Sequence, residues 1–127
     1  MELSLYIDLR RGILDYKVFL TSKLLENIRA DKEKFIYSTY EIAELKLQDI
    51  RDCIFALGHI IQESPDENFY VASMKVFGNV AYMALSCSDE ILYIVSYSRE
   101  GIVKQKTEEK AREKLVGYIK NLKKGKR

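Results

Sequence analysis

The stretch FYVASMKVFGNVAYMALSCSDEILYIVSY, residues 69–97, decides the expected fold. Two short polar turns, at Gly78-Asn79 and at Ser88–Glu90, divide it into three runs rich in β-branched and aromatic residues. Gly-Asn between two such runs is a signal for a two-residue hairpin. The stretch therefore predicts a three-stranded antiparallel meander, with strands over residues 69–77, 80–87 and 91–97.

The three runs are apolar on both faces at their centres, which is typical of strands covered on both sides of a sheet. A short helix over residues 76–87 is the competing interpretation of the same stretch, because short apolar runs do not separate helix from strand by periodicity alone.

Upstream, the alternation of residues 3–9 and 13–20 around Gly12 predicts an N-terminal β-hairpin. Residues 23–30 have apolar side chains at helical spacing and predict a short helix. Residues 35–40 allow two interpretations, because their aromatic and β-branched content favours a strand while their spacing continues the helix that follows. That longer helix is expected from Ser38, which forms a capping-box pattern with Glu41, to Ile61. Its wide apolar stripe favours packing on a sheet over a coiled coil.

The last predicted helix begins at Thr107, with Glu108 and Glu109 in its first turn. The expected fold class is therefore α+β, with a five-stranded, mainly antiparallel sheet. The order is a β-hairpin, helices, a three-stranded meander and a C-terminal helix, which resembles the profilin-like, longin-like and PAS-like topologies. Residues 1–122 are expected to form one domain, and residues 123–127 a basic flexible tail.

Composition places the chain among ordinary folded proteins. Of its 127 residues, 47% are hydrophobic and 31% charged. We find no apolar run of membrane-spanning length and no signal peptide, so we expect a cytoplasmic protein without a membrane partner. Cys53 and Cys87 are expected to be small buried hydrophobes in a reducing compartment. Scarce Asn and Gln beside plentiful Lys and Glu are typical of heat-adapted proteins.

The common catalytic and cofactor motifs are missing from the sequence. One histidine and two isolated cysteines do not supply a zinc site. Neither G-x-x-x-x-G-K-[ST] nor G-x-G-x-x-G occurs, and there is no G-x-S-x-G. We therefore expect no cofactor.

Three carboxylates have an order that resembles the ribonuclease H family. Asp8 ends the first predicted strand, Glu44 lies in Ala-Glu-Leu near the start of the long predicted helix, and Glu108 opens the last helix. In that family, such carboxylates hold two Mg²⁺ ions for phosphodiester cleavage. The resemblance implies a ribonuclease H-like α/β fold and catalytic roles for Asp8, Glu44 and Glu108. The family also has an Asp at the end of its fourth strand, and residues 69–73 offer none.

Charge is unevenly distributed along the chain. Residues 104–127 carry ten Lys or Arg and three Glu, a net charge of +7, and residues 1–103 carry −5, which together give +2. Such a segment is able to contact phosphates. The candidate nucleic-acid-binding residues are Arg10, Arg11, Lys104, Lys106, Lys110, Arg112, Lys114, Lys120, Lys123 and Lys124.

The expected function is that of a small non-enzymatic binding or assembly module that acts through protein–protein contacts. Apolar strand surface and unpaired strand edges commonly become interfaces, so we expect a homo-oligomer, in the simplest case a homodimer, or a protein partner. Two alternatives stay open. One is a nucleic-acid-binding protein that uses the basic C-terminal helix and tail. The other is a ribonuclease H-like metal-dependent nuclease or an inactive relative.

Overall fold

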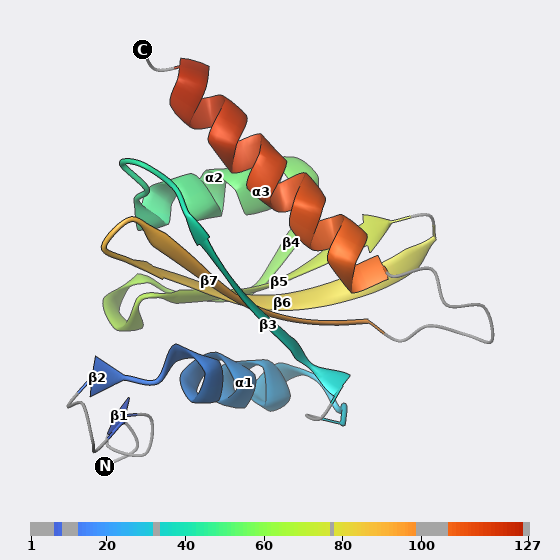
Figure 1. The fold of residues 1–127 in the computed structure, drawn as a ribbon. Helices are drawn as coiled ribbons and strands as arrows, with labels where there is room; N and C mark the ends of the chain where they lie inside the picture. The colour runs from blue at the N-terminus through green and yellow to red at the C-terminus, as the bar shows by residue number, and fades with distance from the viewer. Residues whose placement is uncertain (1–6, 9–12, 32–33, 77, 99–106, 126–127) are drawn as a thin grey trace.

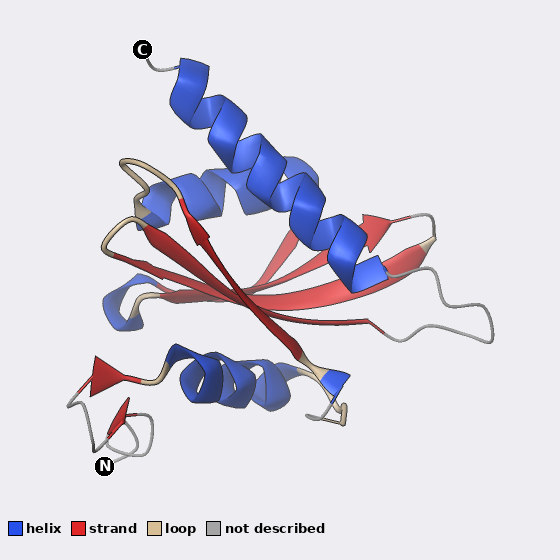
Figure 2. Cartoon of the chain, viewed as in Figure 1, coloured by secondary structure: helices blue, strands red, loops and turns tan. Residues whose placement is uncertain are grey.

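The computed structural model describes residues 7–8, 13–31, 34–76, 78–98 and 107–125 (Figure 1). In chain order, the elements are β1 (Ile7–Asp8), β2 (Ile13–Leu14), α1 (Tyr16–Asn27), β3 (Ile36–Glu41), α2 (Leu47–Leu57), β4 (His59–Ser64), the short 3-10 helix η3 (Pro65–Glu67), β5 (Phe69–Val76), β6 (Asn79–Ser88), β7 (Ile91–Ser98) and α3 (Thr107–Gly125). Figure 2 shows α1 on one side of the main sheet, and α2 and α3 on the other. The fold therefore has three layers.

Strands β5, β6 and β7 form the predicted three-stranded meander. Met74 on β5 pairs with Ala81 on β6, close to the first turn. Gly78 in that turn has a φ of +83°, a conformation that favours glycine. Asp89 and Glu90 form the second turn at φ values of 53° and 64°. Two successive positive φ values match the right-handed twist of the flanking strands. The competing helix in this stretch is not formed.

Two further strands complete the sheet, in the order β3-β7-β6-β5-β4, and all four pairings are antiparallel. The predicted α+β class with a five-stranded antiparallel sheet is confirmed. The ribonuclease H-like α/β alternative is not adopted. A profilin-, longin- or PAS-like topology is not confirmed, because the main sheet begins with the single strand β3 and not with a hairpin.

The predicted N-terminal hairpin is wrong in extent and in place. β1 and β2 pair over two residues each in a separate two-stranded sheet, and the rest of the predicted first strand lies outside the described residues. The second predicted strand is helical from Tyr16 onward. Asp15 caps this helix, because its Oδ1 accepts the Val18 backbone N–H at 3.2 Å. Leu20 and Leu24, one helical turn apart, are then both buried against the main sheet.

The predicted long helix is divided among three elements. Only its middle part, α2, is helical, while its two ends become the edge strands β3 and β4. The capping contact lies at the start of α2, where the Lys46 backbone N–H donates to Asp49 Oδ2 at 2.9 Å. The helix ends at Gly58, where a Cβ would overlap the carbonyl oxygen of Ser73 on β5. Glycine at this position therefore permits the close approach of the two backbones.

Apolar side chains fill one core on each face of the sheet. The larger core, under α2 and α3, includes Ile50, Ile54, Met83, Leu85, Leu115 and Ile119. The smaller core, under α1, includes Phe19, Leu20, Leu24, Phe69, Val71 and Val95. The cover predicted for both sides of the meander is thus confirmed. None of the helices in the described ranges is long and apolar enough to cross a membrane.

Helix α3 begins at Thr107, as predicted, and extends to Gly125. Lys123 and Lys124, which were expected in a flexible tail, therefore belong to the helix. Residues 126–127 lie outside the described part of the chain.

Candidate interaction surface

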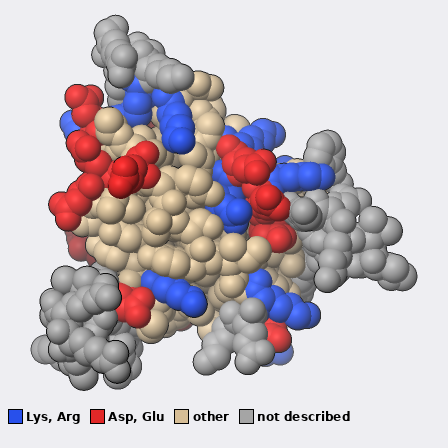
Figure 3. All heavy atoms as spheres, viewed as in Figure 1, with Lys and Arg blue, Asp and Glu red and all other residues tan. Residues whose placement is uncertain are grey.

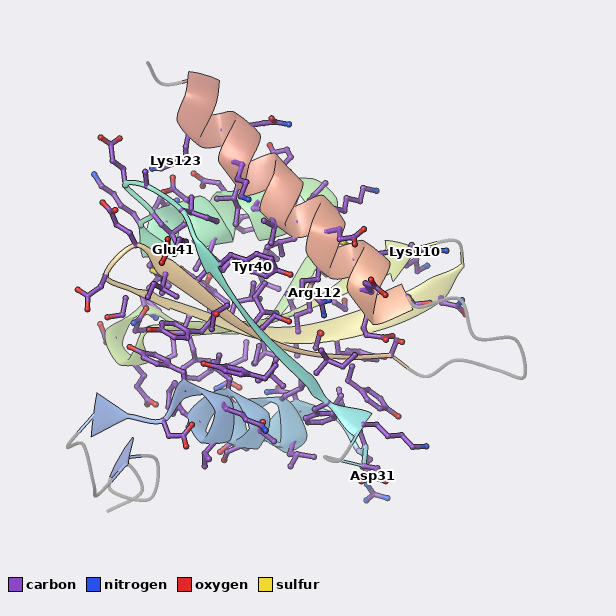
Figure 4. All side chains as sticks on the ribbon, in the orientation of Figure 1. Asp31, Tyr40, Glu41, Lys110, Arg112 and Lys123 are labelled. Atoms are coloured by element: carbon purple, nitrogen blue, oxygen red, sulfur yellow. The ribbon has the colours of Figure 1, made fainter. Side chains whose placement is uncertain are left out.

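Two of the predicted nucleic-acid-binding residues make contacts inside the molecule. Arg112 reaches from α3 to β3, where its Nε donates to the Tyr40 hydroxyl at 2.7 Å (Figure 4). Lys123 Nζ lies 2.8 Å from Asp49 Oδ2 at the start of α2. Both cations are therefore engaged in holding α3 to its neighbours.

Three other candidates, Lys110, Lys114 and Lys120, are exposed on α3, and the exposed Glu113 lies among them. Figure 3 shows positive and negative side chains intermixed on this side of the molecule, without a continuous basic surface. The remaining candidates are Arg10, Arg11, Lys104 and Lys106, which lie outside the described residues, and Lys124, whose side chain is not described. On the described part of α3, the exposed basic candidates are therefore three separate lysines with an acidic side chain among them.

The three carboxylates of the ribonuclease H resemblance occupy different parts of the fold. Asp8 lies in β1, whose two-stranded sheet is beside α1, on the opposite side of the main sheet from α3 (Figure 1). Glu44 is exposed in the turn between β3 and α2, with a φ of 59°. Glu108 lies in the first turn of α3, where its Oε2 accepts the Ser98 hydroxyl at 2.6 Å. The fold does not place Glu44 at the start of a helix, which is what the resemblance requires.

An acidic cleft of about 490 Å³ lies between the β3–α2 and β6–β7 turns. Glu41, Asp89 and Glu90 line it, together with Ile42, whose backbone N–H donates to the Glu90 carbonyl at 2.8 Å. Among the described residues, no group of three or more His, Cys, Asp or Glu side chains is arranged to hold a metal ion. The cleft is therefore an acidic surface without a ligand set for a cation.

Both cysteines are free thiols. Cys53 is buried on α2, and its Sγ–H donates to the Leu115 carbonyl of α3 at 3.6 Å. Burial raises the pKa of Cys53 to about 12. Burial also raises the pKa of the half-buried Cys87, and the negative charge of Asp49 adds to this effect. Because a nucleophilic cysteine needs a lowered pKa, neither environment activates its thiol.

Helix α1 is fixed to the sheet by its inward side. The Phe19 ring meets the Phe69 ring of β5 edge to face at 5.5 Å, and the Tyr16 ring stacks on Tyr93 of β7 at 3.9 Å. The buried Lys23 places its ammonium 5.6 Å and 5.3 Å from the centres of the two phenylalanine rings. These contacts determine which side of α1 faces away from the sheet.

That outward side of α1 carries an open groove of about 840 Å³. Among the described residues, those that line it are Asp15, Lys17, Val18, Thr21, Ser22, Leu25 and Glu26. We call this set the α1 surface. Val18 is 45% exposed and Leu25 is 38% exposed, although both are large apolar residues. A surface helix with one core-facing side has a polar outward side, and α1 departs from this rule at Val18 and Leu25.

Sequence reasoning missed the α1 surface because it assigned residues 13–20 to a strand. Within the helix that forms instead, the apolar residues fall on two opposite sides at 100° per residue. Phe19, Leu20 and Leu24 lie on one side. Val18 and Leu25, seven residues apart, lie on the other. This two-sided pattern is the signal by which a helical interpretation would have predicted the surface.

Comparison with protein-family models, with curated proteins and with solved structures gives no match for this chain.

Proposed function

We propose that this protein is a non-enzymatic binding and assembly module that acts through protein–protein contacts, and that it docks through the α1 surface. The observation that carries the proposal is the exposure of Val18 and Leu25 on the same side of one helix, within a groove. Single exposed apolar residues are normal on protein surfaces. Two exposed apolar residues at a spacing of seven form a stripe along one side of the helix. Helices commonly bind partners through such apolar stripes.

Three other large apolar side chains are exposed among the described residues, namely Ile36, Phe55 and Ile61. Ile36 and Ile61 lie on the two edge strands of the sheet, and Phe55 lies on α2 under the Arg51 guanidinium, 4.5 Å from the ring centre. The α1 surface is supported over them because it combines two apolar residues with a groove.

The chemistry of the thiols supports binding over covalent catalysis. The raised pKa values of Cys53 and Cys87 keep both thiols protonated near neutral pH. Both are free, which fits the reducing, cytoplasmic location that we propose for the protein.

The test is the mass of the full chain in solution, measured by sedimentation equilibrium up to high micromolar concentration. We expect the wild type to associate and the double variant Val18→Glu/Leu25→Glu to be a monomer. Phe55→Glu is the matched control, because Phe55 is 60% exposed and lies on the opposite layer. The control variant is expected to associate like the wild type. A wild type that stays monomeric would contradict the proposal, and so would equal loss of association in the control.

A further inference from the structure

We infer that the partner at the α1 surface is a second copy of this chain, bound so that the two α1 helices cross antiparallel about a twofold axis between Thr21 and Ser22. The inference rests on the proposed function and adds the occupant and the register. In an isologous contact, each residue of one copy meets the residue that the twofold axis assigns to it in the other copy. The surface must therefore be complementary to itself.

The α1 surface has this self-complementarity. An axis between Thr21 and Ser22 places Val18 of one copy level with Leu25 of the other. The twofold symmetry repeats this pair, so Val18 and Leu25 of both copies are covered. The same axis places Lys17 level with Glu26, which pairs a positive with a negative side chain at each end of the contact. All of these residues line the groove.

The centre of the surface suits a close crossing of two helices. Thr21 and Ser22, next to the axis, are small enough to let the two backbones approach. On a helical projection, Lys17 and Glu26 lie on opposite flanks of the stripe formed by Val18, Thr21, Ser22 and Leu25. A crossing angle of about −50°, the commonest class for packed helices, turns these flanks toward each other across the interface. The long side chains of Lys17 and Glu26 then reach one another.

The charges at the two ends of the contact are available for pairing. Within the described residues, Lys17 has no ion-pair partner. Glu26 faces the Lys23 ammonium at 3.7 Å, and Lys23 also has Glu67 as a partner at 3.6 Å. Lys23 is therefore compensated whether or not Glu26 turns toward a second copy.

Charge reversal tests the register directly. In Lys17→Glu, two glutamates face each other at both ends of the contact, and in Glu26→Lys two lysines do. Each single variant is expected to weaken the dimer about tenfold at low salt. The double variant Lys17→Glu/Glu26→Lys restores opposite charges and is expected to regain wild-type association. A mixture of the two single variants is expected to form a heterodimer, because every contact in it pairs opposite charges.

The design also controls for effects within one chain. Glu26→Lys removes the Lys23–Glu26 pair in both the single and the double variant, so recovery in the double variant cannot come from that pair. Lys114→Glu, on the exposed side of α3, is the matched charge reversal and is expected to leave the dimer unchanged. Between about 50 mM and 500 mM salt, the differences among the variants should shrink, because surface charges are screened.

The outcomes separate the register from the proposed function. If Val18→Glu/Leu25→Glu abolishes association while the charge reversals have no effect, the α1 surface docks a second copy in another register, and this inference is overturned alone. If the wild type is monomeric, the inference and the proposed function both fail.

Discussion

Lys123 Nζ lies 2.8 Å from Asp49 Oδ2 and joins the end of α3 to the first turn of α2. The side chains of Lys123 and Asp49 are only 13% and 3% exposed, so the pair is largely shielded from water. Asp49 Oδ2 also accepts the Lys46 backbone N–H that begins α2. One carboxylate thus caps one helix and holds the other in place.

Removing the cation is therefore expected to destabilise the fold. Lys123→Met keeps most of the side-chain volume but leaves Asp49 buried without its charge partner, which should lower the free energy of unfolding by about 3 kcal/mol. Urea denaturation measures the loss. Lys120→Met, on the exposed side of the same helix, should stay within about 0.5 kcal/mol of the wild type. Equal stability of Lys123→Met and the wild type would show that the pair contributes nothing.

Two glycines are expected to respond in opposite directions to alanine. At Gly58 the new Cβ would overlap the Ser73 carbonyl oxygen, and Gly58→Ala should cost about 1–3 kcal/mol of stability. At Gly117, on the exposed side of α3, no atom lies within 4 Å of the new Cβ. Gly117→Ala should therefore stabilise the protein by about 0.8 kcal/mol, the difference in helix propensity. Thermal unfolding of the two variants shows whether each substitution raises or lowers stability. A Gly58→Ala variant as stable as the wild type would contradict the close approach of Gly58 to Ser73.

The Cys53 thiol is expected to make stability depend on alkaline pH. Its pKa is raised from 9.0 to about 12, so between these values the unfolded thiol releases its proton while the folded thiol keeps it. Stability from this group is therefore complete below pH 9 and is lost as pH rises toward 12. Urea denaturation at pH 7 and at about pH 10.5 measures the fall. Cys53→Ala, less stable at pH 7 because of the cavity, should show a smaller fall, whereas an unchanged fall would assign it to other groups.

The meander was predictable because its signals are local. A Gly-Asn turn between two β-rich runs indicates that these runs pair with each other. Apolar residues on both faces of the strands indicate that both faces of the sheet are covered. Thr107 likewise marks the start of α3 through the acidic residues that follow it. In these segments, the local sequence and the tertiary structure favour the same conformation.

The segment from Ser38 to Ile61 was predicted wrongly as one helix because its apolar spacing suits a helix throughout. The alternative strand over residues 35–40, favoured by their aromatic and β-branched content, is confirmed by β3. The interruption of the predicted helix depends on distant contacts. β3 is held by β7, and β4 by β5, while the close approach of Gly58 to Ser73 ends α2. Such pairing partners cannot be recognised from the segment itself.

The candidate surface was missed for a related reason. The alternation of apolar residues from Leu14 to Leu20 fits a strand. The helix is explained only by features of the folded protein, namely the Asp15 cap and the burial of both Leu20 and Leu24 against the sheet. The inward contacts of Arg112 and Lys123 were equally hidden, since their partners Tyr40 and Asp49 are far away in sequence. Counting basic residues along the sequence therefore placed Arg112 and Lys123 on a binding surface, although both make contacts within the fold.

The most direct measurement of the central claim, that two copies assemble through the α1 surface, is disulfide crosslinking at the twofold axis. In the dimer, Thr21→Cys places a thiol beside the same thiol of the second copy. Lys114→Cys places a thiol on the exposed side of α3 instead. After mild oxidation, non-reducing electrophoresis should show a covalent dimer for Thr21→Cys and a monomer for Lys114→Cys. A monomer in both variants, or equal crosslinking in both, would contradict assembly through this surface.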